Sequence, residues 1–152
     1  MSSHRGIATI RLHPWHRGLV YLALIVIAGS GIAWTVLEDW LMQGPGPLPQ
    51  LLLKTHGIFS FLTLMAVGSL LPTHMRLAWR QRRNVLTGVV SALVLLVLIV
   101  TAMGLYYGGE DWRELTKWTH VVVGVAVVLV LPVHVLLGRR TRYRQMARSS
   151  AG

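Results

Sequence analysis

Four histidines lie inside two long apolar stretches of the chain, and their spacing places them on one face of each stretch. His56 and His74 are 18 positions apart, which is about five whole turns of an α-helix. His120 and His134 are 14 positions apart, which is four turns less about 40°. A membrane interior tolerates ionisable side chains where they have a partner, and neutral imidazole is a common metal ligand. The spacing therefore predicts two levels at which facing imidazoles hold a metal.

The composition places the chain among integral membrane proteins. Of its 152 residues, 53% are hydrophobic and 13% are charged, and the mean hydropathy is +0.55. A soluble domain of this length is less apolar. We expect residues 1–152 to form one membrane domain. The chain has no cysteine, which excludes disulfides, iron–sulfur clusters, covalently attached c-type haem and thiolate metal sites.

Four apolar segments are long enough to cross a bilayer as helices, since about 20 residues span its hydrocarbon core. These segments cover about residues 17–37, 50–75, 85–107 and 115–138. The polar or proline- and glycine-rich stretches that predict the connections are 43–49, 80–84 and 108–111. The first segment has the basic lead of a signal peptide but no small-residue cleavage motif, so we expect a retained helix. We predict an all-α fold, a bundle of four transmembrane helices running up, down, up and down.

The charges are distributed unevenly over the two ends of the predicted helices. One end carries 12 of the 15 basic residues, namely Arg5, Arg11, Arg17, Arg76, Arg80, Arg82, Arg83, Arg139, Arg140, Arg142, Arg144 and Arg148. The other end carries all five acidic residues, which are Glu38, Asp39, Glu110, Asp111 and Glu114, with Lys54, Arg113 and Lys117. The positive-inside rule places both termini in the cytoplasm, in a bacterial inner membrane. The net charge of +10 is then a topology signal and a contact surface for anionic lipid, and does not indicate nucleic-acid binding.

The two halves of the sequence resemble each other. Glu-Asp-Trp at 38–40 recurs at 110–112, Lys-Thr-His at 54–56 is echoed by Lys-Trp-Thr-His at 117–120, and Leu-Pro-Thr-His at 71–74 is echoed by Leu-Pro-Val-His at 131–134. Each copy contains the turn between two apolar segments and two histidines. The repeat therefore predicts a bundle built from two similar helical hairpins.

Facing helices would pair the histidines by their depth in the membrane. The second and fourth segments run in the same direction, so His56 should pair with His120 near the periplasmic side and His74 with His134 near the cytoplasmic side. Haem iron accepts one imidazole on each side of the porphyrin plane. The 14 and 18 residues rise about 21 and 27 Å along a helix. The sequence therefore predicts two haems b, stacked across the membrane.

Other residues are placed to complete such sites. Ser60, Thr63 and Gly124 fall on the ligand faces and are small enough to leave room for a macrocycle. Haem propionates need cations, and the candidates are Lys54, Lys117 and Arg113 at the outer haem and Arg76 and Arg139 at the inner haem. None of these residues is predicted to be catalytic.

The fourth segment, with Gly124 and a 14-residue spacing from His120 to His134, resembles the ligand helix of membrane-embedded b-type cytochromes. The likeness covers most of residues 12–140. The chain is similar to the four-helix cytochromes b of bacterial hydrogenases and formate dehydrogenases, and to the cytochrome b of quinol:cytochrome c complexes. In two respects the chain departs from that pattern. The first pair is 18 residues apart, and His13 and His16 open the first segment, where hydrogenase-type relatives take one ligand. His16 is therefore an alternative to His74, whereas we expect His13 at the membrane interface.

Three functions remain open. The favoured one is an electron-transfer subunit, which passes electrons between the quinone pool and a larger redox complex or periplasmic electron carrier. The second is a stand-alone oxidoreductase that oxidises quinol and uses an acid–base group, for which Glu110, Asp111 and Glu114 are candidates. The third is a transporter that moves metal ions or protons through its histidines. The lack of acidic residues inside the apolar segments counts against the third.

Overall fold

The computed structural model of the chain describes residues 14–82 and 84–149. Four long helices make up this part, with one short π-helical segment that continues the first of them. They are α1 (Pro14–Thr35), η1 (Val36–Trp40), α2 (Pro47–Gln81), α3 (Val85–Tyr107) and α4 (Glu110–Ser149). Each long helix is long and apolar enough to cross a membrane. The prediction of an all-α fold with four transmembrane helices is confirmed.

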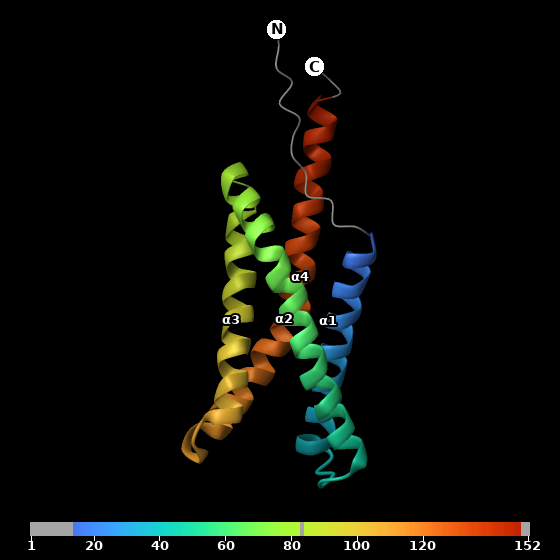
Figure 1. Cartoon of the computed structure of the whole chain (residues 1–152), viewed down its shortest axis with the longest axis vertical. Coiled ribbons are helices and arrows are strands. Elements are labelled where there is room, and N and C mark those ends of the chain that lie inside the picture. The colour runs from blue at the N-terminus through green and yellow to red at the C-terminus, as the bar shows by residue number, and fades with distance from the viewer. Residues whose placement is uncertain (1–13, 83, 150–152) are drawn as a thin grey trace.

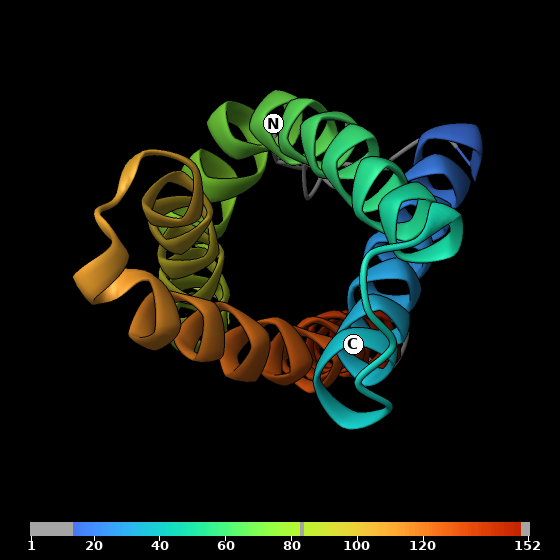
Figure 2. The same cartoon turned by 90° about the horizontal axis from the view of Figure 1, so that it is seen from below.

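The helices follow one another around a ring. Helix α1 packs along α2, and α3 packs along α4, while smaller contacts join α1 to α4 and α2 to α3. Seen along the bundle in Figure 2, the order around the ring is α1, α2, α3, α4. The two helices that carry the paired histidines, α2 and α4, therefore face each other across the bundle, and each hairpin contributes one of them.

The charged residues at the helix ends lie at opposite ends of the molecule. The α1–α2 and α3–α4 connections are at the lower end in Figure 1, and the α2–α3 connection is at the upper end. Asp39 lies in η1 and Glu110 begins α4, so both belong to the lower end. Arg80 and Arg82 close α2 at the upper end. The bundle thus has one acidic end and one basic end. Arg5, Arg11, Arg83 and His13 lie outside the described residues.

Helices α2 and α4 extend beyond the predicted boundaries at both ends, and α3 has the predicted ones. Helix α1 begins three residues earlier than predicted, and η1 continues it past the predicted end. Helix α2 begins at Pro47 and ends at Gln81, so it includes the end of the predicted 43–49 loop and the start of the predicted 80–84 connection. Pro47 fits the first helical turn, where no backbone N–H is needed. Helix α4 runs from Glu110 to Ser149 because helical hydrogen bonding continues after the apolar segment ends. Sequence hydropathy measures the membrane-embedded part, not the whole helix.

The helices pack through small side chains. Ala23 and Ser30 of α1, Thr63 of α2 and Ser91 of α3 are buried, and no large side chain of the described residues is fully buried. Close packing of small residues is typical of membrane helices, because lipid already surrounds the large apolar side chains. The indoles of Trp15, Trp40, Trp79 and Trp112 are exposed, as expected for residues at the membrane–water interfaces.

Candidate functional site

The structure brings the four histidines together in two pairs between α2 and α4. The ring centres of His56 and His120 are 6.2 Å apart and their planes are inclined by 75°. The ring centres of His74 and His134 are 6.0 Å apart, with planes inclined by 78°. These are the two pairs that the sequence predicted from the depth of each histidine in the membrane. His16 is half-buried near the start of α1 and belongs to neither pair.

These distances fit two imidazoles on opposite sides of one metal ion. A metal–imidazole bond is about 2.1 Å and the nitrogen is about 1.1 Å from its ring centre, so two such rings have centres about 6 Å apart. An edge-to-face pair of rings without a metal also has this separation. The hydrogen bonds of the ring nitrogens indicate which nitrogen of each ring is left to bind a metal.

One nitrogen of His56 is held by the neighbouring helix of its own hairpin. His56 Nδ1 lies 2.9 Å from the carbonyl oxygen of Ile27 on α1. A carbonyl oxygen only accepts, so Nδ1 carries the proton and donates it. The neutral ring then has its lone pair on Nε2.

The two α4 histidines are held in the same way by threonines of α3. His120 Nδ1 is 2.8 Å from Thr101 Oγ1, and His134 Nδ1 is 3.0 Å from Thr87 Oγ1. Each hydroxyl has one proton, and both threonines donate it to backbone carbonyls, Thr101 to Val97 at 2.8 Å and Thr87 to Asn84 at 3.0 Å. With that proton directed at the carbonyl, each hydroxyl oxygen can accept the N–H of its imidazole, and the ring then keeps its lone pair on Nε2.

The free nitrogens of these rings are available as ligands. The contacts of His56 with Ile27, of His120 with Thr101 and of His134 with Thr87 all use Nδ1 and not Nε2. A neutral imidazole whose second nitrogen donates to a carbonyl or hydroxyl is the form in which proteins usually bind a metal. His74 is more exposed than the other three, and its ring faces that of His134. The site can hold one metal centre between the rings of each pair.

Two glycines leave room for the histidine rings beside them. A Cβ atom on Gly31 would lie 2.8 Å from Cε1 and 2.9 Å from Nδ1 of the His56 ring, closer than real Cβ atoms approach. A Cβ atom on Gly88 would lie 3.6 Å from Cε1 of His134. Glycine at position 31 therefore lets α1 approach the imidazole closely enough for the Ile27 hydrogen bond.

Ser60, Thr63 and Gly124, which were expected to leave room for a macrocycle, have different surroundings. Ser60 donates to the carbonyl of Gly57 at 2.7 Å. Thr63 is buried and its hydroxyl oxygen has no hydrogen-bond partner in the described part of the chain. A Cβ atom on Gly124 would make an ordinary contact of 3.9 Å with Leu98 of α3. Of these residues, Thr63 is the one with a free polar group inside the bundle.

Two of the three cations expected near the outer pair, Lys117 and Arg113, have acidic partners. Lys117 forms an ion pair with Asp39 of η1, and its ammonium lies 5.8 Å from the Trp34 ring and 5.5 Å from the Trp118 ring. Arg113 pairs with Glu110 at 3.8 Å on the surface. Lys54, Arg76 and Arg139 are exposed. Lys117 is thus already neutralised by a carboxylate of this chain.

Asp39 is a partly buried acidic residue, predicted from the sequence only to belong to the acidic end of the bundle. Its side chain is 15% exposed, and its Oδ2 atom is buried without a hydrogen-bond partner among the described residues. The π-helical turn Val36–Trp40 carries it, and such turns frequently occur at functional sites. By contrast, Glu110, Asp111 and Glu114, the acid–base candidates from sequence, are exposed.

We expect the change Asp39→Ala to destabilise the protein by about 2 kcal/mol, because it leaves the partly buried Lys117 without its counter-charge. The exposed Asp111 provides the matched control, and Asp111→Ala should alter stability by less than about 0.5 kcal/mol. Thermal loss of helicity in detergent measures both effects. Equal unfolding midpoints for the two variants would show that the ion pair contributes nothing.

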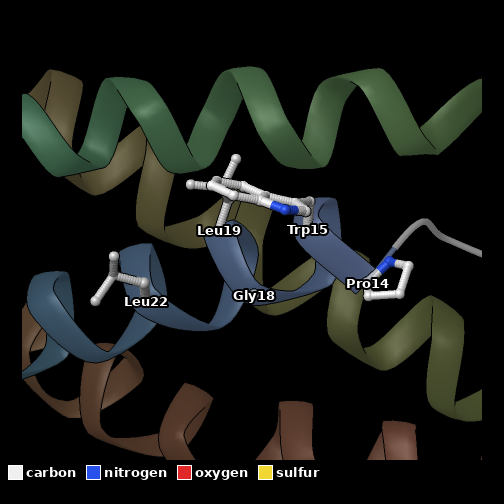
Figure 3. Close-up of a pocket in the computed structure, with 5 residues that line it drawn as sticks. All are labelled: Pro14, Trp15, Gly18, Leu19 and Leu22. Atoms are coloured by element: carbon white, nitrogen blue, oxygen red, sulfur yellow. The ribbon is translucent and has the colours of Figure 1, made fainter.

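A shallow groove on α1 is separate from the histidine pairs. Pro14, Trp15, Gly18, Leu19 and Leu22 line it (Figure 3). None of these side chains ionises or binds metals, and Trp15 and Leu22 are exposed. The groove therefore offers no ligand for a metal.

Comparison of the chain with protein-family models, with curated proteins and with solved structures finds no match. The two histidine pairs are the feature of the molecule from which a function can be inferred.

Proposed function

We propose that the chain is a membrane b-type cytochrome that holds two haems and transfers electrons between the quinone pool and a redox partner. One observation carries this proposal. In both pairs the ring centres are about 6 Å apart, while Nδ1 of three of the rings is bonded to α1 or α3. Nε2 of these rings would then supply the lone pairs that hold the iron of a haem between the histidines of a pair.

Haem fits two histidines per level better than a bare metal ion does. Zinc and similar ions take three or four protein ligands, and the described residues contain no group of three or more His, Cys, Asp or Glu side chains. A porphyrin supplies four nitrogens itself, so its iron needs two axial ligands from the protein. The two histidine ligands at each level therefore favour a haem-binding protein over the metal transporter, which was an alternative from the sequence.

The chain's own residues would bind, orient and insulate the two centres. His56 and His120 would hold one haem, and His74 and His134 the other. Bound haem supplies one-electron redox chemistry. The 14 residues from His120 to His134 rise about 21 Å along α4, so the centres would lie toward opposite faces of the bilayer. The haem propionates would be faced by Lys54 and Arg113 at one end of the bundle and by Arg76 and Arg139 at the other. Lys117 would contact a propionate in addition to its ion pair with Asp39.

The charge distribution supports the proposed orientation in the membrane. Because the basic end contains the α2–α3 connection and the end of α4, it would face the bacterial cytoplasm, with both termini on that side. The short connections leave little of the chain outside the bilayer. We therefore propose that a larger redox complex or a periplasmic carrier exchanges electrons with it, and that anionic lipid contacts the basic end.

Quinol oxidation by the chain alone is the second candidate function, and the buried Oδ2 atom of Asp39 favours it. A carboxylate oxygen without a hydrogen-bond partner can accept the proton that a quinol hydroxyl releases. Turnover of a quinol analogue by the purified chain with an artificial electron acceptor would support this candidate. Inertness without a protein partner would favour an electron-transfer subunit.

The test of the proposed function is the haem content of the purified chain. We expect an absorption spectrum typical of low-spin haem b, which changes on reduction with dithionite. A pyridine haemochrome assay with protein quantification should give two haems per chain. A colourless protein that takes up no haem on reconstitution would overturn the proposal.

A further inference from the structure

The two threonines of α3 make the same contact with the two histidines of α4. Thr101 Oγ1 lies 2.8 Å from Nδ1 of His120, and Thr87 Oγ1 lies 3.0 Å from Nδ1 of His134. These threonines are 14 residues apart, as the histidines are, so α3 presents one hydroxyl at each level. The α2 ring at the outer level is held instead by a backbone carbonyl, which no substitution of a side chain removes.

We propose that Thr101 and Thr87 are positioning residues that set the reduction potentials of the outer and inner haems independently. This inference rests on the proposed function, since the threonines act through histidines that would bind iron. Each hydroxyl fixes the tautomer and the rotation of one ring. Neither threonine would touch the haem iron.

The direction of the effect follows from the polarity of the hydrogen bond. When Nδ1 donates a proton to an acceptor, the ring becomes a stronger electron donor at Nε2. A stronger axial donor stabilises ferric iron relative to ferrous iron and lowers the reduction potential. Loss of the acceptor should therefore raise the potential of the haem that this histidine binds.

The test uses threonine-to-valine changes, which keep the side-chain shape and remove the hydroxyl. In the full-length protein, Thr87→Val should raise the midpoint potential of the inner haem and Thr101→Val that of the outer haem. We expect about a tenfold change in the reduction equilibrium, which corresponds to 59 mV for a one-electron couple. The carbonyl of Leu98 also faces the His120 ring, so the shift should be smaller for Thr101→Val. Thr87→Ser and Thr101→Ser should restore the original values.

Thr119→Val is the matched control. Thr119 is next to His120 in the sequence, but its hydroxyl donates to the carbonyl of Leu115 at 2.7 Å and touches neither ring. Redox titration followed at the haem absorption bands should show unchanged potentials in this variant.

The outcomes separate this inference from the proposed function. Absence of haem from the unmodified protein would refute the proposed function. Two haems with unshifted potentials in both valine variants would refute the inference alone. Equal shifts of both haems in either variant would also contradict it, because the contacts assign one threonine to each level.

Discussion

The change His120→Leu is expected to reduce the haem content of the purified chain from two to about one. His120 faces His56 with ring centres 6.2 Å apart, so its loss would leave the proposed outer haem with His56 as its one histidine ligand. Removal of groups that merely orient metal ligands already costs about 10–100-fold in affinity, and loss of a ligand should cost at least as much. The inner pair is unaffected because its rings belong to another level. The pyridine haemochrome assay on gel-filtered protein measures this directly.

His16→Leu is the control for this experiment, because His16 belongs to neither pair. It should leave two haems in place, whereas His74→Leu should remove the inner one. Loss of the inner haem from His16→Leu, with retention in His74→Leu, would show that the first helix supplies the ligand. Two haems retained in His120→Leu would contradict the assignment of the outer site.

The histidine positions could be predicted because they depend on helical geometry alone. The helical repeat fixes which residues share a face, and the parallel direction of the second and fourth segments fixes which depths match. The 18-residue spacing of His56 and His74 is four residues longer than that of His120 and His134, a difference of about 6 Å in helix rise. The inner rings nevertheless meet, with their centres 6.0 Å apart.

The contacts between hairpins could not be predicted in this way. Lys117 was expected to face a propionate because it is a cation near the outer pair. Its pairing with Asp39 depends on α4 packing against the end of α1 and on the π-helical turn at Val36–Trp40. Neither is encoded in the periodicity of a single helix. The repeated Glu-Asp-Trp was visible in the sequence, but in the second copy Asp111 is exposed.

The threonine contacts were also missed, for a related reason. Thr87 is 47 residues from its partner His134 in the sequence, and Thr101 is 19 residues from its partner His120. Only the antiparallel packing of α3 on α4 selects Thr87 for His134 and Thr101 for His120. A threonine in an apolar helix usually donates to its own backbone, as these do, so the sequence alone gives no sign that the oxygen also serves a second helix.

The change Gly31→Val is expected to remove the outer haem while the inner haem stays bound. Even the Cβ atom of a substituted residue would lie 2.8 Å from Cε1 and 2.9 Å from Nδ1 of the His56 ring, and valine adds two methyl groups to it. The ring must move away from α1, which breaks its hydrogen bond to the Ile27 carbonyl and turns Nε2 from its place opposite His120. Gly31→Ala should have the same effect in weaker form, seen as slower recovery of the second haem on reconstitution.

Gly29→Val provides a control two residues away on the same helix. A Cβ atom on Gly29 meets nothing within 4 Å, so this variant carries the same loss of glycine without the collision. It should retain two haems, and circular dichroism should show equal helicity in both variants. If Gly31→Val also kept two haems with unchanged spectra, the His56 ring would not need its observed orientation for binding. If both glycine variants lost the outer haem equally, general destabilisation of α1 would explain the result, and the close approach of Gly31 to His56 would not be its cause.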